Sequence, residues 1–252
     1  MTRLTELAPR LLVATSRTYS LNSVVVVGQD AAALVIDPGW PTDELEDLAT
    51  EVAERGLHPA AGFATHAHHD HLLWHPALGD VPRWASPDTV RLAGSHRAKI
   101  IEALGPGFEN DVLDLVGRVS ALPGLDVPWP GPETDVVIHD AHVEGHSAIW
   151  IAELGVLVAG DMLSDLELPL PGDEPGALTA YRAGLETLEP YACAARFVVP
   201  GHGSFTTDGA SRVAADLRYL DDLEARRESA DVRLSHPDMA GIHAANQALL
   251  EP

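Results

Sequence analysis

Short apolar runs and amphipathic stretches alternate along this chain. Three strand-like runs come first, at residues 10–15, 20–28 and 31–36, and the last one ends in an Asp-Pro-Gly turn. Residues 43–55 follow Thr42 and carry acidic side chains in their first turns, which is typical of a capped helix. The pattern predicts a sheet whose third strand leads into a helix.

The middle of the chain is helical in pattern, and the second half returns to strands. Ser-Pro at the start of residues 86–104 is a helix-start signal, and 108–116 continues the helical pattern. We interpret about 86–117 as a helical insertion within a single domain spanning 1–252. The second half then contains strand-like runs at 134–138, 147–153, 156–159 and 196–199, and helix-like runs at 177–188 and 208–227.

One loop concentrates side chains that bind metal. It follows the apolar run 60–64 and reads His-Ala-His-His-Asp-His over residues 66–71. The apolar residues 72–74 come next and predict a short helix. Imidazole nitrogen and carboxylate oxygen suit a borderline-soft divalent ion, and sheets place ligands at strand ends. A solvated turn that binds metal only adventitiously is the alternative for the loop taken alone.

Three later loops carry further candidates, each with a glycine that permits a tight turn. They contain Gly145-His146, Gly160-Asp161 and Gly201-His202. A histidine beside glycine in one turn is usually only a turn, so none of these loops is informative alone. Taken with the histidine loop, they complete the predicted ligand set of His66, His68, Asp70, His71, His146, Asp161 and His202.

These motifs, in this order and preceded by Asp37 of Ile-Asp-Pro-Gly, resemble the metallo-β-lactamase-fold hydrolase superfamily. The resemblance extends from about residue 10 to about residue 223. It implies an α+β fold, a four-layer αββα sandwich of two mixed β-sheets with outer helices. The two strand-rich halves of the sequence agree with that architecture.

The resemblance also implies a centre of two Zn²⁺ ions, although iron or manganese would suit the same ligands. It assigns His66, His68 and His146 to the first ion, Asp70, His71 and His202 to the second, and Asp161 to both. Asp70 would also act in acid–base catalysis, and Asp37 would hold the metal loop from behind. A hydroxide shared by the two ions would be the nucleophile.

The ligand set narrows the expected reaction. True metallo-β-lactamases typically have Cys or Ser where this chain has the bridging Asp161, so we expect a hydrolase of another branch. We predict a small acyl substrate, namely an ester, lactone or thioester, because the loop 162–176 is largely apolar. The alternatives are a phosphodiesterase, a non-catalytic metal-stabilised binding protein, and a two-iron redox protein of the flavodiiron type.

Composition excludes several partners. The net charge is -22, from 38 acidic and 16 basic residues, which has the wrong sign for nucleic acid or anionic membranes. The single Cys193 excludes an intrachain disulfide.

The first residues lack a signal-peptide pattern, and no apolar run approaches the roughly 20 residues of a membrane span. We therefore expect a cytoplasmic enzyme with a small-molecule substrate, and a homodimer is compatible with the sequence.

Overall fold

The computed structural model describes residues 4–250, and its eleven strands form two sheets. The first sheet has the order β1-β2-β3-β4-β5-β6-β7, with antiparallel pairs up to β4 and parallel pairs after it. Its strands are β1 (Thr5–Ala8), β2 (Leu11–Thr15), β3 (Asn22–Val27), β4 (Ala32–Ile36), β5 (His58–Phe63), β6 (Arg83–Ala85) and β7 (Ser120–Ala121). The second sheet has the order β11-β10-β9-β8, and its strands are β8 (Asp135–His139), β9 (His146–Ile151), β10 (Val156–Gly160) and β11 (Phe197–Pro200).

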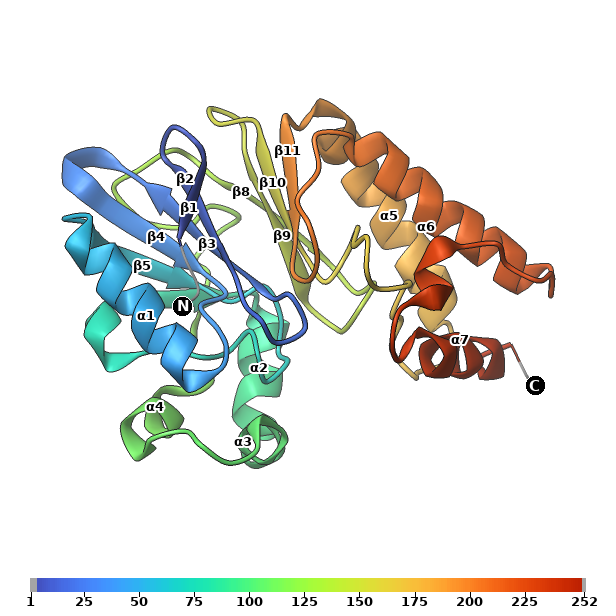
Figure 1. Cartoon of the computed structure of the whole chain (residues 1–252), viewed down its shortest axis with the longest axis horizontal. Coiled ribbons are helices and arrows are strands. Elements are labelled where there is room, and N and C mark those ends of the chain that lie inside the picture. The colour runs from blue at the N-terminus through green and yellow to red at the C-terminus, as the bar shows by residue number, and fades with distance from the viewer. Residues whose placement is uncertain (1–3, 251–252) are drawn as a thin grey trace.

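Helices cover the outer face of each sheet (Figure 1). Helix α1 (Thr42–Glu54) lies on the first sheet, and α5 (Ala177–Ala194) and α6 (Gly209–Glu224) lie on the second. The remaining helices are α2 (Pro87–Ser95), α3 (Arg97–Leu104), α4 (Asn110–Leu115) and α7 (Met239–Ala248). Three short 3-10 turns occur at Gln29–Ala31, Pro76–Leu78 and Val232–Ser235. Within residues 4–250, none of the helices has both the length and the apolar character that crossing a bilayer requires.

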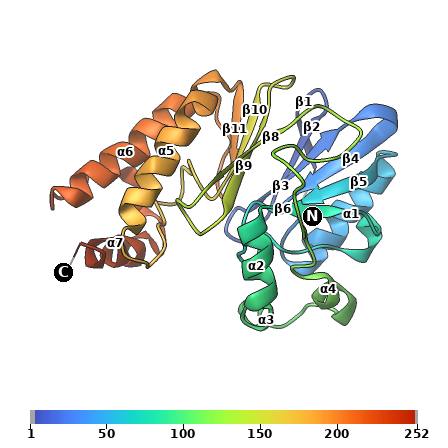
Figure 2. The ribbon, with the colours of Figure 1, turned by 180° about the vertical axis from the view of Figure 1, so that it is seen from behind.

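The alternation of side chains along the strands produces the layers. In β4, Leu34 and Ile36 point toward the second sheet, whereas Ala33 and Val35 point toward α1. In β10, Val158 joins the core between the sheets and Leu157 faces α5 and α6. Because both faces of the central strands are buried, their sequences are continuously apolar. The predicted αββα sandwich is confirmed, and both views of the ribbon show its layers (Figures 1 and 2).

One local expectation is wrong, and one helix is not predicted from the sequence. Residues 72–74 form no regular secondary structure, because Leu72 and Leu73 pack into one apolar cluster while Trp74 packs into another. At the other end of the chain, the sequence does not predict α7, since its residues have a weak apolar pattern. Helices α2, α3 and α4 do fall within the predicted helical segment 86–117.

A buried arginine fixes the C-terminal segment to the rest of the fold. Arg233, in the last 3-10 turn, is 3% exposed and contacts the equally buried Asp216 of α6 at 2.5 Å. Its guanidinium also donates to the carbonyl oxygens of Ser164 at 3.2 Å and Glu167 at 3.0 Å, and it pairs with Asp231 at 2.7 Å. Burial raises the pKa of Asp216 to about 6 even with this cation beside it. The arginine therefore joins α6, the C-terminal segment and the loop after β10.

Replacing this arginine should destabilise the protein strongly. Arg233→Met leaves the carboxylate of Asp216 buried without its cation, and such losses cost about 3–5 kcal/mol of unfolding free energy. Urea denaturation followed by circular dichroism would measure the change. Arg227→Met is the matched control, because Arg227 pairs with Asp222 while its own side chain is 58% exposed, and that variant should change stability little. Equal effects of the two substitutions would contradict the structural role given to Arg233.

Candidate metal centre

Loops from both sheets bring histidine and aspartate side chains together. The loop after β5 supplies His66, His68, Asp70 and His71 from the first sheet. The second sheet supplies three more residues: His142 from the β8–β9 loop, Asp161 directly after β10 and His202 after β11. The site therefore lies at the strand ends where the two sheets meet.

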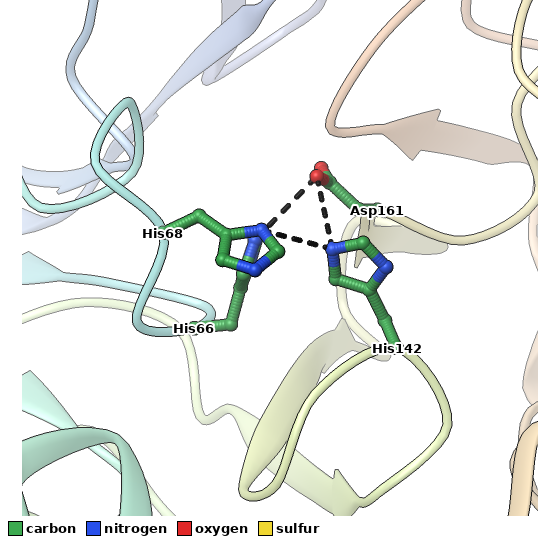
Figure 3. Close-up of side chains that lie close together, drawn as sticks. All are labelled: His66, His68, His142 and Asp161. Atoms are coloured by element: carbon green, nitrogen blue, oxygen red, sulfur yellow. Dashed lines mark hydrogen bonds and ion pairs between the residues drawn. The ribbon is translucent and has the colours of Figure 1, made fainter. Parts of the chain in front are cut away.

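The first group consists of His66, His68, His142 and Asp161 (Figure 3). The Nδ1 atom of His68 lies 3.0 Å from Nε2 of His142, and Oδ2 of Asp161 lies 3.5 Å from Nε2 of both His66 and His142. All the ligand atoms of the group lie within 4.8 Å of one another, three from imidazoles and one from a carboxylate. This is a donor set that a divalent metal ion accepts in proteins.

The second group consists of Asp70, His71 and His202. The Nε2 atoms of His71 and His202 are 3.4 Å apart, and Oδ2 of Asp70 lies 3.3 Å from Nε2 of His202. Asp161 also reaches this group, because its Oδ1 is 3.2 Å from Nε2 of His71 and its Oδ2 is 3.5 Å from Nε2 of His202. One carboxylate thus lies between the two groups.

Hydrogen bonds on the far side of the rings fix which nitrogen faces the site. Nδ1 of His71 donates to Asp37 at 2.9 Å, Nδ1 of His142 donates to the carbonyl of Leu170 at 2.7 Å, and Nδ1 of His202 donates to the carbonyl of Tyr19 at 2.9 Å. With Nδ1 engaged in this way, Nε2 of each ring is directed into the site, where it can bind an ion once it carries no proton. The three rings are oriented as ligands before any ion binds.

Asp37 lies behind the metal loop. One of its carboxylate oxygens accepts the backbone N–H of Thr65 at 2.8 Å, and the other contacts the Thr65 hydroxyl at 2.6 Å and His71. Asp37 is 2% exposed, so these contacts are shielded from water. It holds the first residue of the loop and one ring of the second group together.

The first group includes His142 and not His146, the residue that the sequence analysis assigns to the first ion. The His146 ring lies beside this group, with its centroid 5.1 Å from that of His66. His146 is the first residue of β9, where strand pairing sets it opposite His139. Its Nε2 accepts the backbone N–H of Asp161 at 3.0 Å, and its Nδ1 lies 3.3 Å from Nε2 of His139. Its Nε2 is thus engaged by the backbone of Asp161, a member of the first group, and its Nδ1 lies against His139. His142 has no glycine neighbour, and its only signal in the sequence is that it lies four residues before His146.

Two glycines allow the loops of the second sheet to approach this closely. Gly160 has φ +55°, and a Cβ atom there would lie 2.4 Å from Nε2 of His146. A Cβ atom at Gly201 would lie 2.0 Å from Oδ1 of Asp161. Any side chain at these two positions would displace Asp161 or the ring that supports its backbone.

The donor atoms fit a metal ion. Nε2 of His66 and Oδ1 of Asp161 are buried, and neither has a hydrogen-bond partner among residues 4–250. Their other contacts are to each other's residues and to His71, with Oδ1 of Asp161 3.2 Å from Nε2 of His71 and Nε2 of His66 3.5 Å from Oδ2 of Asp161. A buried polar atom that makes no hydrogen bond costs about 1–3 kcal/mol, so a cation bound between these atoms would be favourable. Nitrogen and carboxylate donors without thiolate suit a divalent cation of the zinc, iron or manganese type. The one cysteine, Cys193, is exposed on α5.

The two groups differ in protonation. Burial lowers the pKa of His68 to about 4 and holds the pKa of His66 well below its ordinary value, so these rings are neutral at pH 7. Burial alone would also lower the pKa of His71 and His202. The carboxylates around them, above all Asp161, outweigh that effect and raise both pKa values well above the ordinary range. Without metal, the imidazoles of the first group are neutral, whereas His71 and His202 of the second group are protonated.

A cavity of about 580 Å³ opens onto both groups. Ligand side chains form part of its lining, together with Glu167 and Asp173. Its apolar wall is made by Val143, Leu170, Pro171 and Ile242, and Tyr19 lies at its edge. The loop 162–176 therefore contributes to the pocket. The helical segment 86–117 contributes none of the described residues that line this cavity.

Substitution of the two neighbouring histidines should separate their roles. His142→Ala removes a donor atom, so the first group should lose its metal ion. His146→Phe keeps every donor atom but leaves the N–H of Asp161 unpaired, so metal affinity should fall only about 10- to 100-fold. Metal content after dialysis and competition with a chromogenic chelator would measure both changes. The exposed His96→Ala is the control, and greater metal loss from His146→Phe than from His142→Ala would refute the exchange of roles.

Metal binding should depend on pH differently in the two groups. A metal ion must displace protons from His71 and His202, because their raised pKa values keep them protonated at pH 7. Affinity of the second group should therefore rise as the pH is raised above neutral, whereas affinity of the first group should change little. Calorimetric titration in buffers of different ionisation enthalpy would count the protons released. Absence of proton release at pH 7 would contradict this assignment.

Comparison with known proteins agrees with the fold. Residues 17–212 match the family model of the metallo-beta-lactamase superfamily. A beta-lactamase domain protein from Burkholderia ambifaria superposes with a TM-score of 0.73 at 18% identity, covering 98% of this chain and 86% of that one. A metallo-beta-lactamase family protein from Thermus thermophilus gives a TM-score of 0.68 at 20% identity, covering 97% and 93%.

A metallo-beta-lactamase from Pontibacter korlensis is similar over 88% of this chain and 100% of its own, with 19% identity and a TM-score of 0.65. At these identities the structural likeness concerns the fold alone. The family model covers well over half of the sequence and includes the loops that carry His66 to His71, His142, Asp161 and His202. The chain belongs to the metallo-beta-lactamase superfamily.

Proposed function

We propose that the protein is a binuclear metal-dependent hydrolase, with zinc as the expected ion, that cleaves a small acyl substrate such as an ester, lactone or thioester. The observation that carries the proposal is the Asp161 carboxylate, which lies within 3.5 Å of imidazole nitrogens from both groups. Two donor groups that share a carboxylate are a suitable arrangement for two adjacent ions.

The residues would divide the chemistry among themselves. His66, His68 and His142 would hold one ion, Asp70, His71 and His202 the other, and Asp161 would contact both. When bound, such ions lower the pKa of a coordinated water to about 7 and polarise a substrate carbonyl. Asp37 and the backbone carbonyls behind the histidines keep the rings in place while this happens.

Asp70 is suited to orient the attacking water by accepting a hydrogen bond from it. Burial alone would raise the pKa of Asp70, but the neighbouring imidazoles of His71 and His202 outweigh it and hold that pKa below the ordinary range. The carboxylate is therefore ionised at neutral pH. Since Asp70 also lines the cavity, its Oδ1, which lies 3.5 Å from Nδ1 of His69, could accept a hydrogen bond from the attacking water and so orient it.

The cavity supports an acyl substrate over a phosphodiester. Its volume of about 580 Å³ suits a small molecule. None of the described residues that line it is Lys or Arg, the side chains that usually bind phosphate oxygens. The apolar wall formed by Val143, Leu170, Pro171 and Ile242 would instead bury a hydrocarbon chain.

A substrate panel tests the proposal. The zinc-loaded protein would be assayed with an aryl ester, a lactone, a thioester, a cephalosporin and a phosphodiester. We expect turnover of at least one of the three acyl compounds. Asp161→Ala should lose both metal and turnover, because it removes the carboxylate shared by the two groups. Asp70→Asn should keep most of the fold and lower the rate about 10²- to 10⁴-fold, the range for removing an acid–base group.

His96→Ala, which alters an exposed residue outside both donor groups, is the control for expression and handling. Unchanged metal content and turnover in Asp161→Ala would refute the shared-carboxylate assignment. Turnover of the phosphodiester alone would favour the alternative reaction. Metal binding without turnover of any panel member would count against an acyl hydrolase.

A further inference from the structure

Glu167 is the one glutamate among the described residues that line the cavity of the metal centre. It shares that lining with His68, Asp70, Asp161 and His202, which belong to the two donor groups. Its carboxylate forms no hydrogen bond or ion pair with any residue in the described range 4–250. Burial raises the pKa of Glu167 to about 7, and the nearby Asp161 and Asp70 add to this effect while His202 opposes it.

The backbone of Glu167 is fixed, so its side chain is held at the cavity. Its N–H donates to Oγ of Ser164 at 3.1 Å, and its carbonyl accepts from the buried Arg233 at 3.0 Å. The same Ser164 hydroxyl donates to the carbonyl of His202 at 2.8 Å. The loop that carries Glu167 is thus connected directly to a residue of the second donor group.

The surroundings of this carboxylate favour a cation. The cavity lining contains no Lys or Arg among described residues, and Asp173 is a second acidic side chain in it outside the two donor groups. The apolar residues Leu170, Pro171 and Ile242 line the same cavity. A substrate whose apolar chain ends in a positive charge would contact the apolar residues with its chain and pair with the acidic side chains. The same acidic side chains would repel a substrate that ends in a carboxylate.

We propose that Glu167 forms a subsite for a positively charged group, so that the preferred substrate is an acyl compound bearing an ammonium group distant from the scissile bond. This inference rests on the proposed hydrolase function and specifies its substrate class. The metal centre would hold the acyl carbonyl, the apolar wall would contact the chain, and Glu167 would pair with the ammonium.

A matched ester series tests the subsite. The substrates are p-nitrophenyl esters of equal chain length whose acyl chains end in methyl, ammonium or carboxylate. We expect kcat/KM to follow the order ammonium, methyl, carboxylate. In Glu167→Gln the ammonium-to-methyl ratio should fall about 10- to 100-fold, the effect expected from losing one charge-assisted pair. The change should lie mainly in KM.

Glu174→Gln is the matched control, because Glu174 belongs to the same loop but is exposed and outside the cavity lining. It should retain the wild-type order of substrates. An equal loss for all three esters in Glu167→Gln would overturn the subsite, because it would indicate a role in the reaction itself. Loss of metal from Glu167→Gln would also overturn it, because Glu167 would then be a metal ligand.

A binding experiment separates this inference from the proposed function. Hexyltrimethylammonium cannot ligate a metal ion, so its affinity for the zinc-loaded protein, measured by calorimetry against hexan-1-ol, reports on the subsite alone. Preference for the cation in the wild type, lost in Glu167→Gln, would support the subsite even if no ester were hydrolysed. Equal affinity for the two ligands would overturn it even if esters were hydrolysed.

Discussion

The Asp161 carboxylate imposes the constraint on which the centre depends. It lies between two clusters of imidazoles and is buried there. One of its own oxygens, Oδ1, has no hydrogen-bond partner among the described residues. Its backbone is held by His146 and by the turn at Gly160, and Gly201 leaves room for its side chain. Asn22 adds a link from the first sheet, because its side chain donates to the carbonyls of Pro200 at 2.9 Å and Gly203 at 2.8 Å. The loop of His202 is thereby placed opposite the histidine loop.

The sequence is sufficient to predict the sandwich and most of the donor set. Continuous apolar runs identify strands that are buried on both faces, and the density of ligating side chains at 66–71 identifies the metal loop. It is not sufficient to choose between His142 and His146. That choice depends on where β9 begins, since a residue inside the strand has its direction set by pairing, whereas a residue in the preceding loop can turn toward Asp161. Strand boundaries are set by tertiary contacts and are poorly encoded locally.

The other errors have similar causes. Leu72, Leu73 and Trp74 have the composition of a helix, but they serve two different apolar clusters and therefore leave the helical path. The residues of α7 look weakly patterned because only part of one face is buried, around Met239 and Asn246. In both segments the long-range packing partner determines the conformation. The role of Arg233 cannot be inferred from sequence either, because Asp216, Ser164 and Glu167 are distant from it along the chain.

Each donor group draws on both sheets. The first combines His66 and His68 from the first sheet with His142 and Asp161 from the second, and the other combines Asp70 and His71 with His202. A bound ion would consequently act as a cross-link between two layers that also share an apolar core. Separation of the layers would break every metal site at once, so ion release and sheet separation would be one cooperative event, and metal concentration would set the resistance of the whole sandwich to opening.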